Sequence, residues 1–366
     1  MARVKLEDVC ERGSSNLKQS DVVDKDGDYP IYGASGYIGN VDFYHQEQPY
    51  VAVVKDGAGI GRTTLHPAKS SVIGTMQYLL PKDNVLPEYL CYVVKYMHLE
   101  KYFTGATIPH IYFKDYKNEE FNLDSLDRQK EIVSTLNKIE KVIESRTKEL
   151  ELLDELIRAR FVEVFGNPLD GTAKYPIHQV GEVANSVDPQ PSHRTPPVEE
   201  GGIPYVSIKD CDYKTGKIDF EGARKVSPKV LEEHMNRYTL HDGDFVVGKI
   251  GTIGNPVFVP ARNDYTLSAN VVLVQPNSEL VSPYFLKYSF ESDFVERQFA
   301  EAKNSTSQAA FGIQKVRTVE VMNPDLDVQR EFEIFVKQVT KSKVAVQKAL
   351  DETQILFDSL MQKYFG

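Results

Sequence analysis

A segment of 41 residues occurs twice in the chain, and this internal repeat limits which folds the chain can adopt. The first copy opens with LDRQKEI at Leu126 and closes with Phe165-Gly166; the second opens with LDVQREF at Leu326 and closes with Phe365-Gly366. The two copies keep one offset of 200 residues from end to end. A shared register of this length indicates a duplicated architecture, so we expect the order globule, helix, globule, helix.

Each copy is predicted to be one long helix that pairs with the other as an antiparallel coiled coil. Neither copy contains proline or glycine before its closing glycine, and apolar residues recur in alternating steps of four and three. Arg146, Arg160 and Lys343 interrupt this seam and are interpreted as polar residues that set the register or lie in solvent. Further apolar residues lie off the seam and predict a second face, which packs on the globular domains or binds partner proteins. The candidate partner-binding residues are Val133, Val142, Leu156, Phe161, Phe335, Val344, Leu356 and Met361.

The two globular segments are predicted to be diverged α/β domains, which makes the fold class α+β with a pseudo-twofold relation. Tyr50 to Val54 and Tyr78 to Leu80 are strand-like runs, and Tyr89 to Tyr102 is a helix-like run. The second segment repeats these features and carries an insertion around Asp210 to His234. The predicted boundaries are 1–125 for the first domain, 126–166 for the first spacer helix, 167–325 for the second domain and 326–366 for the second spacer helix.

Charge and cysteine content narrow the function classes. The net charge of −10 argues against an extended basic surface, so any contact with DNA is expected to be a local patch or to depend on a basic partner. Three isolated cysteines fit a reducing cytoplasm, and no apolar run is long enough to span a bilayer. We therefore expect a cytoplasmic protein without a membrane segment.

Glycine-rich and hydroxyl-rich loops are the candidate DNA-binding segments. The loop from Gly57 to Thr64 lacks both the Walker pattern and GxGxxG, which leaves a tight turn between strands or a turn that approaches a phosphate. Polar side chains in the loops of both globules can donate to bases or phosphates. The candidates are Tyr32, Ser35, Tyr37, Lys55, Arg62, Thr107, His110, Tyr112 and Lys114 in the first domain, and Ser207, Lys209, Lys249, Thr252, Asn255, Ser305, Thr306, Ser307, Gln308 and Lys315 in the second. A polar surface loop is the alternative interpretation for each of them.

No recognised catalytic or metal-binding pattern occurs in the sequence. His110 has no serine, cysteine or carboxylate near it in a known arrangement, and the eight histidines show no paired metal spacing. We also find no glycine motif for S-adenosylmethionine and no complete nuclease core. We therefore expect no catalytic residue and no metal site in this chain.

Taken together, these features resemble the specificity subunit of type I restriction–modification systems. The resemblance covers essentially all 366 residues and includes LDRQKEI and LDVQREF at the helix starts, FVEVFGNP at the first helix end, and YPIYGASGYIGN with VVKDGAGIGR in the first globule. The first domain, at about 125 residues, is shorter than is usual in the family, which predicts a smaller contact area or another half-site length.

The resemblance implies a non-enzymatic subunit that reads a bipartite target in double-stranded DNA, with one half-site for each domain. It also implies two modification subunits as partners, which bind S-adenosylmethionine and methylate adenine, and restriction subunits that translocate and cleave DNA with ATP and Mg. No cofactor is expected in this chain. A fused methyltransferase or nuclease and a scaffold with two protein-binding heads remain the alternatives.

Overall fold

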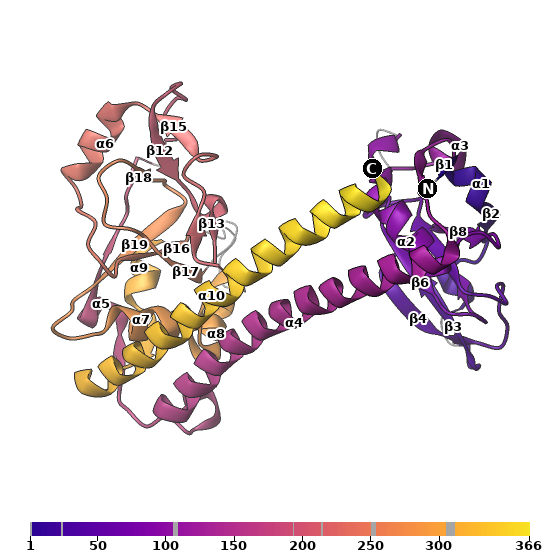
Figure 1. Cartoon of the computed structure of the whole chain (residues 1–366). Coiled ribbons are helices and arrows are strands. Elements are labelled where there is room, and N and C mark those ends of the chain that lie inside the picture. The colour runs from indigo at the N-terminus through magenta and orange to yellow at the C-terminus, as the bar shows by residue number, and fades with distance from the viewer. Residues whose placement is uncertain are drawn as a thin grey trace. The chain divides into compact units, whose positions relative to one another are not determined.

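The computed structural model describes residues 2–22, 25–104, 109–192, 194–213, 215–249, 254–304 and 312–366. The chain divides into two compact units, each of which combines a globular domain with parts of both long helices (Figure 1). Unit 1 comprises Met1–Lys148 with Val346–Gly366, and unit 2 comprises Glu149–Ala345. Helix α4 is Leu126–Phe165 and helix α10 is Leu326–Phe365. No helix among the described residues is long and apolar enough to cross a membrane.

Among the residues that the structure describes, the globular part of unit 1 contains three sheets and five short helical segments. A four-stranded antiparallel sheet has the order β2-β8-β5-β6, a three-stranded sheet has the order β4-β3-β7, and β1 pairs with β9. The strands are β1 Ala2–Lys5, β2 Cys10–Ser14, β3 Tyr29–Gly33, β4 Gly36–Val41, β5 Tyr50–Val54, β6 Thr63–His66, β7 Ser71–Val72, β8 Met76–Pro81 and β9 Glu120–Leu123. The helical segments are α1 Leu6–Val9, α2 Pro87–Tyr96, η2 Leu99–Tyr102 and α3 Phe113–Tyr116, and a further 3-10 turn is η1 Gln19–Asp21.

Strand β5 lies at the centre of unit 1 because both of its faces are apolar. All five of its residues are buried. Val51 and Val53 belong to the core shared with α2, whereas Tyr50, Ala52 and Val54 belong to a second core. This division follows from the two-residue period of a strand, which sends successive side chains to opposite faces.

Unit 2 repeats this topology and adds to it. The sheet β11-β19-β16-β17 corresponds to β2-β8-β5-β6, β15-β12-β18 corresponds to β4-β3-β7, and β10-β20 corresponds to β1-β9. The strands are β10 Ile177–Gln179, β11 Ala184–Val187, β12 Ile203–Val206, β15 Arg224–Val226, β16 Phe245–Gly248, β17 Gly254–Phe258, β18 Thr266–Leu267, β19 Val271–Pro276 and β20 Glu320–Met322. The helical segments are η3 Pro168–Asp170, α5 Val180–Val183, η4 Ile208–Asp210, α6 Pro228–Met235, α7 Pro283–Phe290, α8 Asp293–Asn304 and α9 Ile313–Arg317. The predicted insertion contains the hairpin of β13 Cys211–Asp212 and β14 Lys217–Ile218, together with α6.

The two long helices pair antiparallel within each unit, as the repeat predicts. In unit 1 the start of α4 meets the end of α10, where the Arg128 guanidinium lies 6.0 Å from the Tyr364 ring centre. In unit 2 the end of α4 meets the start of α10, where the Phe161 and Phe332 rings lie 5.5 Å apart. Two α/β domains joined by two long antiparallel helices confirm the predicted fold class.

Polar residues on the seam are accommodated in unit 2 by contacts between the helices. Lys343 of α10 lies 2.5 Å from Asp154 of α4, and the Arg160 guanidinium lies 5.8 Å from the Phe335 ring centre. The Lys343 pair is consistent with its interpretation as a register-setting residue, because an ion pair of this kind forms in one alignment of the helices.

Candidate nucleic-acid interface

The glycine-rich loop of unit 1 is a tight turn that joins β5 to β6. Val54 N donates to Arg62 O at 2.9 Å, and Gly61 N donates to Val54 O at 2.9 Å. Gly61 has a φ of +81°, and a Cβ there would lie 2.6 Å from the Glu100 backbone nitrogen. Only glycine fits this combination of backbone conformation and close approach. The tight-turn interpretation is therefore correct for the loop, and contact with a phosphate stays a prediction.

The loop that carries the candidate residues His110 and Tyr112 packs directly on this turn. Gly57 N donates to Pro109 O at 3.0 Å, and Ile111 N donates to Lys55 O at 3.0 Å. His110 Nδ1 lies 2.6 Å from Asp56 Oδ1, which ties the side chains of the two loops together. The structure thus brings Lys55 and His110 to one place although they are 55 residues apart in sequence.

The third predicted loop, between β3 and β4, joins the same cluster through Arg62. Arg62 Nη1 donates to Ala34 O at 3.0 Å, and the guanidinium also covers Gly59. Ser35 and Tyr37 follow Ala34 and are exposed, with 63% of Tyr37 accessible. Three loops that the sequence suggested separately therefore form one continuous surface, which we call the unit 1 loop cluster.

Aromatic rings and cations stand together on the unit 1 loop cluster. The His110 and Tyr112 rings lie 6.4 Å apart and nearly parallel, and Lys114 Nζ lies 5.3 Å from the Tyr112 ring centre. Tyr32 lies 6.1 Å from Tyr37, ring centre to ring centre. Such groups can donate to base edges, hold phosphates and contact thymine methyl groups. The arrangement is chemically suited to nucleic acid.

The candidates in unit 2 differ in how accessible they are. Ser207 is buried and precedes η4, where its backbone N donates to Asp210 Oδ2 at 2.8 Å, whereas Lys209 is exposed. Asn255 is partly buried at the start of β17 with a φ of +43°. Lys315 Nζ lies 3.5 Å from Ala302 O at the C-terminal part of α8. Contacts between η4 and β16 place Lys209 near strand β16.

Lys249 is the candidate whose environment differs most from the prediction. Its ammonium lies 2.7 Å from Asp188 Oδ2, and 7% of the lysine side chain and 10% of the aspartate side chain are accessible. A buried ion pair of this kind neutralises the positive charge inside the protein. A contact between Lys249 and a phosphate would first require this pair to open. Thr107, Thr252, Ser305, Thr306, Ser307 and Gln308 lie outside the described residues.

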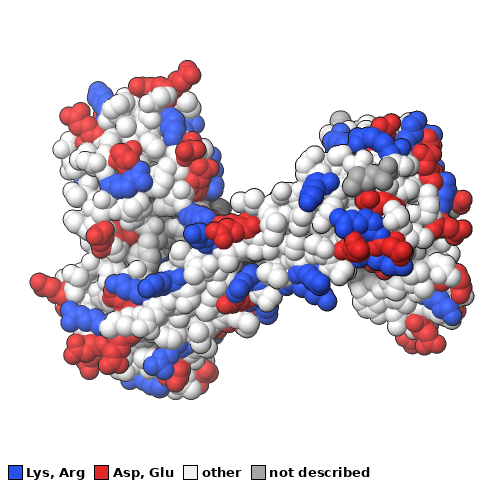
Figure 2. Space-filling model, viewed as in Figure 1, with Lys and Arg blue, Asp and Glu red and all other residues white. Residues whose placement is uncertain are grey.

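Charged residues of both signs are interspersed on the surface. On the face drawn in Figure 2, Lys and Arg alternate with Asp and Glu on both units, in keeping with the net charge of −10. Among the residues that the structure describes, no group of three His, Cys, Asp or Glu side chains could hold a metal ion. The candidate interface is consequently a set of local loops rather than a broad basic surface.

The predicted partner-binding residues fall into two groups. Val142, Leu156, Val344 and Leu356 are exposed, as a partner surface requires. Val133, Phe161 and Met361 are buried in the cores of their own units, and Phe335 is partly buried against the unit 2 core. The prediction that Val133 and Met361 contact a partner is therefore corrected, whereas Phe161 also lines a pocket and its contact with a partner stays a prediction. These off-seam side chains pack on the chain's own globular domains. Packing on the domains was one of the two alternatives predicted for the second apolar face, the other being partner binding.

Two aspartates were missed by the sequence analysis. Asp56 positions His110, and Asp188 neutralises Lys249. Lys249 directly follows the buried run Phe245 to Gly248, so a lysine at that point needs a carboxylate nearby. The sequence does not reveal which carboxylate this is, because Asp188 lies 61 residues away.

Comparison with known proteins assigns the family. Residues 1–155 and 174–353 match the family model described as type I restriction modification DNA specificity domain. The match covers well over half of the chain and places the chain in the class of DNA specificity proteins. The chain belongs to the family of specificity subunits of type I restriction–modification systems, and its domains recognise DNA sequence.

Individual relatives agree with this assignment. The chain is 21% identical over 324 residues to the type I restriction enzyme MjaVIII specificity subunit of Methanocaldococcus jannaschii, covering 82% of this chain and 76% of that protein. The crystal structure of the type I restriction–modification S subunit from M. genitalium superposes with a TM-score of 0.60 at 14% identity, covering 100% of this chain and 96% of that one. A structure described under complex assembly and conformational transition of the type I R-M system gives 0.53 at 14% identity, covering 99% and 97%. At these identities the two structures support the fold.

Proposed function

We propose that each domain of this chain reads one half of a split target in double-stranded DNA, through the loops that follow its central strands. The observation that carries this proposal is the convergence of three loops in unit 1, linked by Gly57–Pro109, Asp56–His110 and Arg62–Ala34 contacts. A preformed cluster of this kind holds its side chains in place before DNA arrives, which lowers the entropic cost of binding. The equivalent region of unit 2 uses different residues on the same topology, as different half-sites require.

Within the unit 1 loop cluster, base contacts and phosphate contacts are assigned to different side chains. We assign the proton of the His110–Asp56 hydrogen bond to His110 Nδ1, and in that neutral tautomer Nε2 is an acceptor. An acceptor reads the exocyclic amino group of adenine or cytosine in the major groove. Arg62 and Lys114 are exposed cations on the same cluster and are assigned to phosphates.

The chemistry of the complex is assigned to partner subunits. In this proposal two modification subunits bind S-adenosylmethionine and methylate the DNA, and restriction subunits use ATP and Mg for translocation and cleavage, while this chain is not catalytic. The exposed Leu156 and Leu356 support two equivalent docking surfaces, because the 200-residue repeat places them at the same position of each helix. Recruitment of the modification subunits through these exposed helix residues completes the proposed function.

Charge reversal in the loops tests the DNA-binding assignment. Lys114→Glu and Lys315→Glu should each lower the affinity of the assembled complex for cognate DNA about tenfold, and the slope of log K against log salt should fall by about 1 for each lost phosphate contact. Lys5→Glu and Lys229→Glu make the same charge change at exposed sites outside the loops and should bind as the wild type does. Wild-type affinity and salt dependence in both loop variants would show that these loops do not contact DNA.

A further inference from the structure

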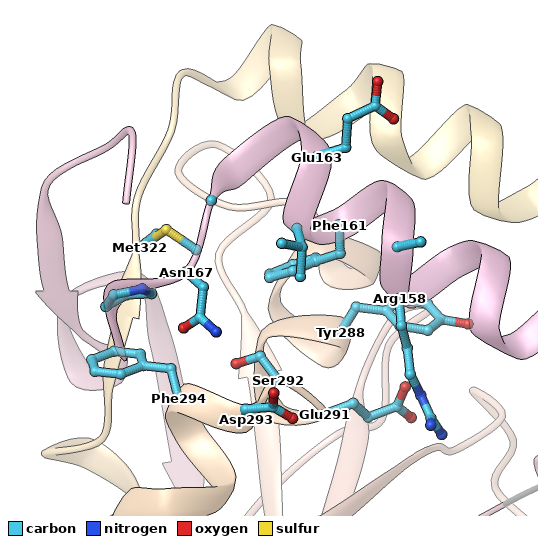
Figure 3. Close-up of a pocket in the computed structure, with 14 residues that line it drawn as sticks. Arg158, Phe161, Glu163, Asn167, Tyr288, Glu291, Ser292, Asp293, Phe294 and Met322 are labelled. Carbon is cyan, nitrogen blue, oxygen red and sulfur yellow. The ribbon is translucent and has the colours of Figure 1, made fainter. Parts of the chain in front are cut away.

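A pocket of about 610 Å³ opens in unit 2, where the last turns of α4 meet the junction of α7 and α8 (Figure 3). Phe161, Val162 and Tyr288 contribute apolar walls, and Asn167 and Ser292 contribute polar groups. This volume lies in the range of cavities that take a small molecule or a large side chain. None of the lining residues belongs to the loops proposed to read DNA.

The internal repeat gives this pocket a counterpart in unit 1. The 200-residue offset equates Val162 and Gly166 with Gln362 and Gly366, and the α7 start at Pro283 equates with the α2 start at Pro87. Leu90 and Leu286 then occupy equivalent positions, and both are fully buried, which supports the alignment. In the same alignment Ser292 of unit 2 corresponds to Tyr96 of unit 1.

The counterpart in unit 1 is filled by a tyrosine. The Tyr96 ring lies 6.0 Å from the Phe365 ring, and its hydroxyl donates to Gln362 Oε1 at 2.9 Å. A Cβ placed on Gly366 would lie 2.7 Å from the same hydroxyl oxygen. In unit 1 the Tyr96 ring therefore packs against the last turn of α10. The equivalent position in unit 2, beside the last turn of α4, is the pocket.

In unit 2 the serine leaves this space open. Ser292 Oγ donates to Ser289 O at 2.7 Å, so the hydroxyl is used within its own turn. The Phe165 ring packs instead against Phe161 and Phe285, at 4.9 and 4.7 Å between ring centres. Phe161 and Tyr288 remain as walls on one side of the pocket, and Ser292 lies beside Phe294 on the other (Figure 3).

We propose that the pocket receives an aromatic side chain from a partner protein, in the place that Tyr96 fills in unit 1. A polypeptide is the occupant because exposed apolar side chains stand at the pocket: the lining residue Val162 is 47% accessible, and Leu169, which follows the lining residue Pro168, is also exposed. A free ring in the pocket would leave these side chains in water, whereas a bound protein segment covers them and gains the energy of that burial. The inference is independent of which residues contact DNA.

The charged residues at the pocket are of both signs, since Glu163 and Glu291 have cationic partners and Arg158 and Asp293 add one charge of each sign. Ring shape is therefore the basis of selection. Glu163 accepts from Arg160 at 2.9 Å and points away from the pocket in Figure 3. Glu291 lies 2.5 Å from Lys287. Asn167 and Ser292 remain inside the pocket as polar groups that can meet a phenol hydroxyl, so tyrosine and phenylalanine are both suitable occupants.

The test uses the full chain with its methionine methyl groups labelled for NMR, and blocked tripeptides as probes. Tripeptides with a central tyrosine or phenylalanine should shift the signal of the Met322 methyl group, which lines the pocket, and a tripeptide with a central leucine should bind at least fivefold more weakly. Ser292→Tyr should abolish binding by filling the pocket, and the double variant Ser292→Tyr, Val162→Gln should restore the pair seen in unit 1. Ser278→Tyr makes the same change at an exposed serine outside the pocket and should bind as the wild type does.

The outcomes separate the possibilities. Equal binding of the leucine peptide, an unshifted Met322 signal, or undiminished binding in Ser292→Tyr contradicts the proposal. Binding of p-cresol without binding of the tyrosine peptide also contradicts it, because the pocket would then be a small-molecule site. If Ser292→Tyr does not fold, Ala159→Phe is the second variant. Ala159 lines the pocket but is exposed on α4, so a phenylalanine there should block the pocket and give the same loss of binding.

Discussion

At the residue scale, the accessible cations and the buried ones differ in their surroundings. The Lys249–Asp188 pair lies inside unit 2, and removal of one partner would leave an uncompensated buried charge, at a cost of roughly 3–5 kcal/mol. Arg62, Lys114 and Lys209 are exposed and carry no such cost. Of the lysines and arginines that the sequence predicts to contact DNA, these three are the exposed ones.

His66 gives unit 1 a specific dependence on pH. Burial lowers the pKa of this imidazole to about 4, from 6.5 in an unfolded chain. As the pH falls from 6.5 towards 4, the unfolded state binds a proton that the folded state excludes, so stability is lost in this window by up to about 1.4 kcal/mol per pH unit. Above pH 6.5 the contribution is fully present.

Urea unfolding of the protein between pH 4 and 7.5 measures this effect. The free energy of unfolding in the His66→Phe variant should depend less steeply on pH in this window. His98→Asn, a change at an exposed histidine, should keep the wild-type slope. Identical slopes in wild type and His66→Phe would mean that His66 titrates in the folded protein as it does in water.

The residue scale also shows what the sequence could not supply. The composition of the loops predicted that Arg62 and His110 contact DNA, and the structure places both residues on one surface. The partners Asp56 and Asp188 have no local signature, because each contact joins segments more than fifty residues apart. Tertiary proximity of this kind is set by sheet pairing, and a single sequence does not specify it.

At the element scale, the long helices were predictable and the sheets only in part. Repetition and a 3.5-residue apolar period are local signals, and both helices run from leucine to phenylalanine over the predicted span. The helix-like run from Tyr89 to Tyr102 is in fact broken, because His98 adopts a left-handed conformation with a φ of +49° between α2 and η2. Nothing in the composition of that run marks the break.

Exposed leucines on the helices predict how partner subunits bind. Leu156→Lys and Leu356→Lys should each weaken binding of one modification subunit about 10- to 100-fold, since loss of a buried leucine costs roughly 1.5–3 kcal/mol. Each variant should then form complexes with one modification subunit, and the double variant with none. Mass photometry of purified complexes measures this ratio.

A matched control for these variants is Leu280→Lys, which makes the same change at an exposed leucine between β19 and α7. It should assemble as the wild type does. Full assembly of the double variant at nanomolar concentrations would move the partner surface away from this helix face.

At the scale of the whole molecule, the duplication predicts tolerance to circular permutation. The Gly366 carbonyl accepts hydrogen bonds from Arg3 Nη1 and Asn122 Nδ2, both at 3.1 Å, so the chain ends lie close together within unit 1. Residue 366 joined to residue 1 by a short linker, with a new start after Asp170, should fold and assemble with its partners. Asp170 and Gly171 are exposed, so the cut disturbs little packing.

Gel filtration and melting temperature of the permutant provide the measurement. A second permutant that opens between Leu90 and Cys91, inside the buried helix α2, should fail to fold and serves as the control. Failure of the Asp170 permutant alongside an intact linker-only variant would count against the duplicated layout.

The most direct test of the central claim is methylome sequencing of cells that express this chain with its modification subunit. The wild type should methylate one motif with two specified halves separated by unspecified bases, because the proposed function assigns one half to each domain. The variant His110→Ala, Tyr112→Ala should relax one half of the motif and leave the other unchanged, since both residues lie on the unit 1 loop cluster. A continuous motif, or equal loss of specificity in both halves, would contradict the account.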